Sequence, residues 1–94
     1  MNIVRQLIWD DENVEHIARH AITPEEVEEV CHSNPVVRRT RQQRLLLVGR
    51  TVAGEYLIVI LDPEGGGVYY PVTARPATRA ERRYYQKQKA GESS

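Results

Sequence analysis

The residues best suited to chemistry lie near the end of the chain. A predicted strand ends at Arg75, and the predicted helix after it carries four further candidates: Arg79, Glu81, Arg82 and Tyr85. Glu81 and Tyr85 are four residues apart and therefore share a helix face. A carboxylate can accept a proton, a phenol can relay one, and guanidinium groups can neutralise charge on phosphorus. This set suits metal-free cleavage of an RNA backbone, because RNA carries its own nucleophile in the ribose 2′-hydroxyl.

A structural interpretation of the same helix is also open. Glu81 follows Thr78 by three residues, which is the spacing of a capping box. In that case the Glu81 carboxylate caps the helix and does not move protons. Tyr84 and Tyr85 would then be ordinary side chains at the edge of the core.

Two histidines form a second candidate site. His16 and His20 are four residues apart, so they lie on one face of a predicted helix. They could contact a substrate, pack against the protein or, with Cys31 and His32, bind zinc. The Cys-x-x-Cys and His-Glu-x-x-His patterns of common zinc sites are absent from the sequence. We therefore expect neither a metal site nor another cofactor.

Charge is divided unevenly along the chain. Residues 1–32 hold eight acidic and two basic side chains, and residues 33–94 hold five acidic and eleven basic ones. A run of arginines crosses the middle of the sequence: Arg38, Arg39, Arg41, Arg44 and Arg50. Arginine favours bidentate contacts with phosphate, although charged side chains also protect an edge strand from aggregation. The pattern fits a basic face for nucleic acid, or two solvated faces of one domain.

The elements that must hold these residues follow from hydrophobic periodicity. We expect, in order, a strand over residues 3–9, a helix capped by Asp10 or Asp11, a helix from Thr23 to the Asn34-Pro35 pair, strands over 44–50, 55–61 and 68–74, and a helix from Thr78 to about Lys89. A further short strand over 36–39 extends the sheet. The expected buried residues of the two early helices are Val14, Ile17, Ala18 and Ala21, followed by Val27, Val30 and Cys31.

The strands over 44–50 and 55–61 are apolar at both parities, so we expect both of their faces to be covered. Residues 62–67 have the composition of a loop, and Pro71 indicates an edge or a bulge. The order β-α-α-β-β-β-α predicts an α+β domain with a small antiparallel sheet and helices packed on one face.

The length of 94 residues corresponds to one domain. We expect a single domain over residues 1–94, with an ordered core over about 2–89 and a flexible tail over 90–94. The one cysteine excludes an intramolecular disulfide framework. No basic-then-apolar leader and no run near the ~20 apolar residues of a membrane span is present. We therefore expect a cytoplasmic protein that does not bind membranes.

Several motifs together resemble the BrnT family of toxins. The first is Trp9-Asp10-x-x-Asn13-x-x-His16-Ile17-x-Arg19-His20-x-Ile22-Thr23-x-x-Glu26-Val27. The second half adds Leu47-Val48-Gly49-Arg50-Thr51, then Thr73-Ala74-Arg75 and Glu81-Arg82-Arg83-x-Tyr85. The matches run in order over residues 9–85.

The BrnT family is similar to the RelE-type ribonuclease toxins, and the resemblance therefore implies a RelE-like α+β fold. It also implies an endoribonuclease that cleaves RNA without metal by 2′-hydroxyl attack. A co-encoded ribbon-helix-helix antitoxin would neutralise it. The expected assembly is a toxin homodimer or a toxin–antitoxin heterotetramer. The resemblance aligns Arg75, Glu81, Tyr85 and the Arg19-His20 pair with the family's motifs. On this hypothesis the expected catalytic residues are Arg75, Arg79, Glu81, Tyr85 and His20, and the expected substrate-binding residues are His16, Arg19, Arg50 and Arg82.

Three departures from the family pattern support a second hypothesis. The usual lysine after the Trp9-Asp10 pair is missing, and Pro76 follows Arg75 where lysine is common. The isoelectric point of about 6.8 is low for a protein that holds RNA. The alternative is a catalytically inactive, toxin-like binding module that acts only in complex with an antitoxin or DNA.

Overall fold

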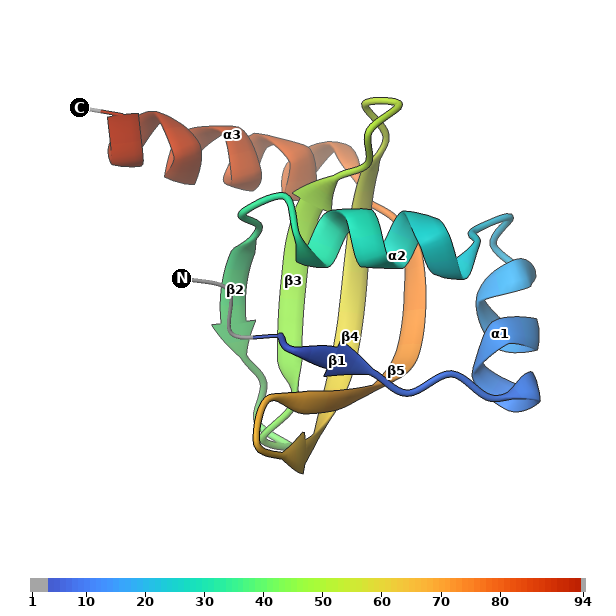
Figure 1. Cartoon of the computed structure of the whole chain (residues 1–94). Helices are drawn as coiled ribbons and strands as arrows, with labels where there is room; N and C mark the ends of the chain where they lie inside the picture. The colour runs from blue at the N-terminus through green and yellow to red at the C-terminus, as the bar shows by residue number, and fades with distance from the viewer. Residues whose placement is uncertain (1–3, 94) are drawn as a thin grey trace.

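A five-stranded sheet forms the centre of the fold (Figure 1). The computed structural model describes residues 4–93, so the expectations for residues 1–3 and 94 lie outside it. The elements follow the order β1 (Gln6–Leu7), α1 (Asp11–Ala18), α2 (Pro24–Cys31), β2 (Val36–Arg39), β3 (Leu45–Arg50), β4 (Tyr56–Gly65), β5 (Val68–Pro76) and α3 (Arg79–Ser93). The predicted α+β class, the two early helices and the short strand over 36–39 are confirmed.

The strands lie in the order β1-β5-β4-β3-β2. β2 to β5 form an antiparallel meander, whereas β1 pairs in parallel with β5. The sheet is therefore mixed, and the expectation of a purely antiparallel sheet is wrong for β1. The physical reason is the connection between β1 and the next strand in the chain. Two helices join β1 to β2 in place of a hairpin, so an antiparallel direction is not imposed on β1.

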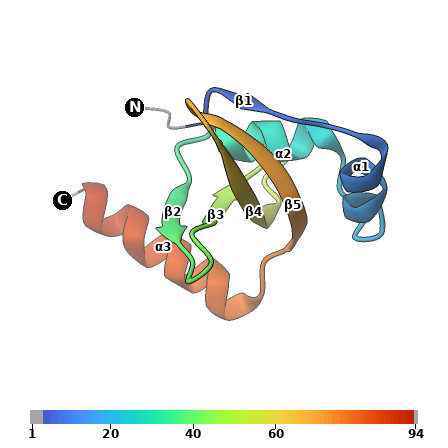
Figure 2. The same cartoon turned by 90° about the horizontal axis from the view of Figure 1, so that it is seen from below.

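Helices cover both faces of the sheet. α2 packs on one face, α3 crosses the opposite face beside β2 and β3, and α1 lies along β5 at the edge of the sheet (Figure 2). The expectation that all helices pack on one face is therefore wrong for α3. Leu47 belongs to the core under α2, whereas the neighbouring Leu46 lines the side that faces α3. Strands with two apolar faces need cover on both, and α3 supplies the second cover.

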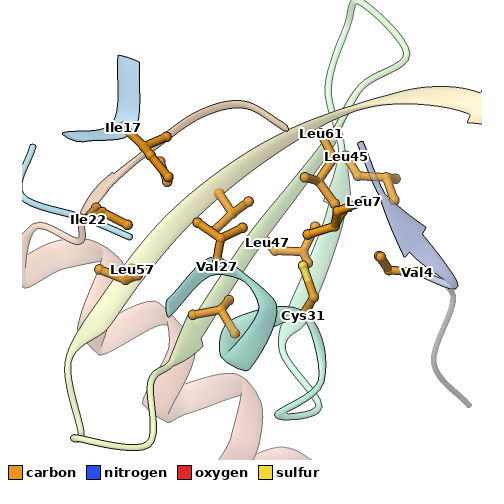
Figure 3. Close-up of a cluster of buried hydrophobic side chains, with 13 residues drawn as sticks. Val4, Leu7, Ile17, Ile22, Val27, Cys31, Leu45, Leu47, Leu57 and Leu61 are labelled. Carbon is orange, nitrogen blue, oxygen red and sulfur yellow. The ribbon is translucent and has the colours of Figure 1, made fainter. Parts of the chain in front are cut away.

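The main core lies between the sheet and α2 (Figure 3). Leu47 is fully buried there, and Cys31 is only 1% exposed. Burial, together with the Glu28 carboxylate, raises the pKa of the Cys31 thiol to about 12. The thiol therefore stays protonated and packs as a small apolar group. α2 approaches β3 closely at Gly49, where an added Cβ would come within 3.0 Å of Val30 Cγ1.

A reciprocal capping box begins each helix. The pairs are Asp10 with Asn13, Thr23 with Glu26, and Thr78 with Glu81. The predicted buried stripe of α2 is confirmed at Val27, Val30 and Cys31. The prediction of burial for Ala18 and Ala21 is wrong, because α1 ends at Ala18 and the chain turns at Ala21 with φ of 59°.

The hairpin between β4 and β5 is longer than predicted. β4 continues to Gly65, so most of the expected loop over 62–67 is strand, and the turn uses positive φ at Gly65, Gly66 and Gly67. Pro71 faces Leu61 beside a shift of register, which confirms the predicted bulge. α3 extends to Ser93, beyond the expected end at Lys89, and the flexibility of residues 90–94 stays a prediction.

Candidate functional site

Arg75 and Glu81 form a bidentate ion pair where β5 ends and α3 begins. Arg75 Nη1 donates to Glu81 Oε1 and Nη2 donates to Oε2, each at 2.8 Å. Glu81 Oε1 also accepts from the Thr78 backbone N–H at 2.8 Å. The predicted cap and the predicted site residue are therefore the same carboxylate. The cap at Thr78 begins α3 shortly after β5 ends at Pro76, and this short connection brings the two side chains together.

The pair strongly favours the charged form of both groups. The hydrogen bonds from Arg75 are the largest of the effects that lower the pKa of Glu81 to about 2. Burial opposes them, and the hydrogen bonds from Thr78 lower the pKa further. The hydrogen bonds that Arg75 donates to Glu81 raise the pKa of Arg75. A carboxylate with so low a pKa is a weak proton acceptor at neutral pH. The arrangement instead holds a guanidinium in one orientation at a partly exposed position.

α1 brings a histidine to the same strand. His16 Nε2 lies 3.1 Å from Thr73 Oγ1, across 57 residues of sequence. Thr73 faces Ile60 and Arg75 faces Ile58 in the β4–β5 register. Two residues two apart on a strand point to the same face, about 6.6 Å from each other along the chain. His16 therefore reaches the face of β5 that carries Arg75.

His20 lies in the turn after Ala18, beyond the end of α1, so the prediction that it shares a helix face with His16 is wrong. Its ring lies edge-on to that of His16, with centroids 6.3 Å apart. Arg19 and His16 line a hollow of about 350 Å³ together with Tyr70. Arg79 is exposed in the first turn of α3.

Tyr85 does not join the Arg75–Glu81 pair. Its ring packs edge-to-face on Tyr56, with centroids 5.6 Å apart. Tyr84 instead lines a groove of about 360 Å³ together with Glu81. Glu81 and Tyr85 therefore line different hollows, and their joint action at one site stays a prediction.

Arg50 and Arg82 accompany Tyr85 around Tyr56. The Arg50 guanidinium carbon lies 5.1 Å from the centre of the Tyr56 ring, and that of Arg82 lies 4.8 Å from it. These distances are typical of cation–π contacts. The structure thus divides the predicted site residues between two neighbouring groups, one around Arg75 and one around Tyr56.

The alternative zinc site is not assembled. Cys31 lies in the core, and His32 Nδ1 lies 2.7 Å from the Glu28 backbone oxygen at the end of α2. Within residues 4–93, no group of three or more histidine, cysteine or carboxylate side chains is arranged to hold a metal ion. The same part of the chain contains no helix with the length and apolar character needed to cross a membrane.

The arrangement of strands and helices has a solved counterpart. It is similar to the crystal structure of the ribonuclease toxin BrnT of Brucella abortus, with a TM-score of 0.65 and 23% identity over 79% of this chain and 97% of that chain. The chain has a BrnT-like fold. No protein-family model and no curated protein matches the sequence. The roles of individual side chains within the BrnT-like fold therefore rest on their own geometry.

Two residues of this BrnT-like fold that contact predicted site residues were not themselves predicted from the sequence. Tyr56 pairs directly with Arg50 across the β3–β4 hairpin, a register that the predicted turn at Gly54 could have indicated. Thr73 could not be recognised as the partner of His16, because their meeting depends on how α1 packs against β5. Local spacing contains no information about such a contact.

Proposed function

We propose that this chain is a ribonuclease toxin of a type II toxin–antitoxin pair. The observation that carries the proposal is Arg75, which lies in the last strand of a BrnT-like fold and is held by Glu81 at a partly exposed position. A solved protein with this fold is a ribonuclease toxin. An oriented guanidinium is suited to stabilise the charge that develops on phosphorus during RNA cleavage.

The proposed reaction is attack of the ribose 2′-hydroxyl oxygen on the adjacent phosphorus. The bond from phosphorus to the 5′-oxygen of the next nucleotide breaks, so the products are a 2′,3′-cyclic phosphate and a 5′-hydroxyl. Arg75 binds the non-bridging oxygens and offsets their growing charge, with Arg79 as a second cation at the start of α3. The protein supplies positioning and charge, and the reaction proceeds without a metal.

We assign proton transfer to the histidines. Imidazole exchanges protons near neutral pH, whereas Glu81 is held in its charged form by Arg75 with a pKa of about 2. His16, oriented by Thr73, accepts the proton of the 2′-hydroxyl. His20 donates a proton to the departing 5′-oxygen. Glu81 acts through Arg75 as a positioning residue.

The proposed partners are RNA and a co-encoded ribbon-helix-helix antitoxin. The excess of basic residues in the second half of the sequence supports contact with RNA. We propose a cytoplasmic toxin that is neutralised by its antitoxin. The proposed assembly is a toxin homodimer or a toxin–antitoxin heterotetramer.

The test is incubation of the purified protein with single-stranded RNA in EDTA. We expect fragments that end in 2′,3′-cyclic phosphate, and about a 10²–10³-fold slower reaction for Arg75→Ala. Arg83→Ala is the matched control, because Arg83 is exposed on α3 and has no proposed role. RNA that stays intact at high protein concentration would overturn the proposal.

One observation favours the alternative of a non-catalytic binding module. The Arg75 guanidinium already donates to Glu81 and to the Pro76 backbone oxygen, the latter at 3.2 Å. A substrate phosphate must share or replace these contacts. Intact RNA combined with tight binding of the antitoxin would support the binding module.

A further inference from the structure

Tyr56 is the centre of a cationic cluster on the face of the sheet that α3 crosses. Arg50 reaches the ring from β3 and Arg82 reaches it from α3, at 5.1 Å and 4.8 Å from the ring centre. Both guanidinium groups are therefore within about 10 Å of each other, the largest separation that these two distances allow. Tyr85 closes the cluster with its edge-to-face contact.

The positive charge of this cluster is not neutralised by an ion pair. The ion pairs within the described residues join Arg44 to Asp62 and Arg75 to Glu81, so Arg50 and Arg82 have no carboxylate partner there within 4 Å. Two carboxylates lie in the surrounding hollows. Glu29 accepts a hydrogen bond from the Val52 backbone N–H at 3.0 Å, and Glu55 lines the hollow beside Tyr56. Two unpaired positive charges this close to each other attract an anion.

The cluster adjoins the proposed reaction site. Ile58 faces Arg75 across β4 and β5, and Tyr56 lies two residues earlier on the same face. Such diagonal neighbours in a sheet are about 7–8 Å apart. A hollow of about 150 Å³ is lined by Tyr56, Arg82 and Pro76, and the Pro76 backbone oxygen accepts from Arg75 Nη1. An extended chain that occupies the reaction site therefore meets the cluster next.

We infer that Arg50, Arg82 and Tyr56 form a second phosphate-binding site for single-stranded RNA. The site binds the backbone phosphate beside the scissile linkage, and the contacts with the ring fix where both guanidinium groups lie. The identity of the ligand rests on the proposed function. Two anchored phosphates would fix the direction of the RNA across Arg75, which a single contact cannot do.

Binding is measured without cleavage, using a short fluorescent oligoribonucleotide whose 2′-hydroxyls are all methylated. Removing the nucleophile allows the unmodified protein to be compared with its variants. The test variant is Arg50→Gln with Arg82→Gln, and the matched control is Arg83→Gln with Lys87→Gln. The control removes the same charge from exposed positions of α3.

We expect the test variant to bind at least about tenfold more weakly than the control. Its plot of log affinity against log salt should be shallower by about 0.7, the loss of one phosphate contact with a single strand. Tyr56→Phe should bind normally because it keeps the ring. Tyr56→Leu should bind weakly while it still unfolds cooperatively in a thermal melt.

Equal affinity of the test and control variants would overturn the second site. So would weaker binding that matches a loss of folded protein in the melt. A protein that cleaves no RNA yet binds the methylated oligonucleotide through Arg50 and Arg82 would refute the ribonuclease proposal and keep this site. If the protein cleaves RNA, but neither cleavage nor binding changes when Arg50 and Arg82 are replaced, the ribonuclease proposal stands and the second site is refuted.

Discussion

Glu81 faces Arg75 with both carboxylate oxygens, and each oxygen lies 2.8 Å from one terminal nitrogen of the guanidinium. Such a paired geometry fixes the plane of the guanidinium as well as its position. The same carboxylate caps α3 through Thr78. Helix formation and orientation of Arg75 are therefore coupled through one side chain.

The shape of the Arg75 side chain should matter as much as its charge. Lysine keeps the charge but cannot form the paired contact with Glu81. We expect Arg75→Lys to slow cleavage almost as much as Arg75→Ala, by about 10²-fold. The measurement is the initial rate of cleavage of a short RNA in EDTA. Arg83→Lys is the control, and full activity of Arg75→Lys would contradict a role for the paired geometry.

Glu81 and His16 should affect the pH profile differently. Glu81→Gln retains the ability to cap the helix but loosens Arg75, so we expect about tenfold slower cleavage with an unchanged pH profile. His16→Gln should abolish the limb of the profile that reports the proton acceptor. The rate is measured from pH 5 to 9. Loss of that limb in Glu81→Gln, with retention in His16→Gln, would identify Glu81 as the base.

The ion pair should also make stability depend on acid. The folded-state pKa of Glu81 is about 2 against an ordinary 4.5, so the contribution is complete above pH 4.5 and disappears as pH falls toward 2. Arg75 is 40% exposed at its side chain, and solvent screening therefore limits the contribution to about 1 kcal/mol.

Thermal melts at several pH values would reveal this contribution. Glu81→Gln should lower the Tm by about 4–8 °C near pH 6, and the difference from the unmodified protein should disappear as the pH falls through 2. A difference that stays constant over this range would show that the ion pair is not its origin.

The Cys31 thiol should be inert in the folded protein. It is 1% exposed, and burial raises its pKa to about 12, so neither access nor thiolate is available to a reagent. We expect no reaction with a disulfide reagent at pH 8 and one equivalent of reaction in denaturant. Rapid labelling under native conditions would contradict the described core.

Leu47 should be among the most sensitive positions for stability. It is fully buried beneath α2, and Leu47→Ala leaves a cavity that costs about 2–5 kcal/mol. Val52 is 87% exposed, so Val52→Ala should change the free energy of unfolding by less than about 0.5 kcal/mol. Urea denaturation of both variants provides the comparison.

Local signals in the sequence were sufficient for most individual elements. Thr23 with Glu26, and Thr78 with Glu81, act over three residues, so their capping boxes can be recognised without a fold. The apolar runs of β3 and β4 likewise indicated strands that are covered on both faces. The face chosen by α3 could not be predicted, because both faces of those strands were equally apolar.

The sequence by itself determined the class of the fold, the caps of α2 and α3 and the burial of Cys31, since these depend on neighbours along the chain. Only the tertiary structure decided that His16 contacts Thr73 and that the ring of Tyr85 packs on Tyr56. Those contacts join distant segments, and they depend on strand register and on how helices pack across the sheet. The site of a small domain is assembled by packing, even where each of its residues can be recognised in advance.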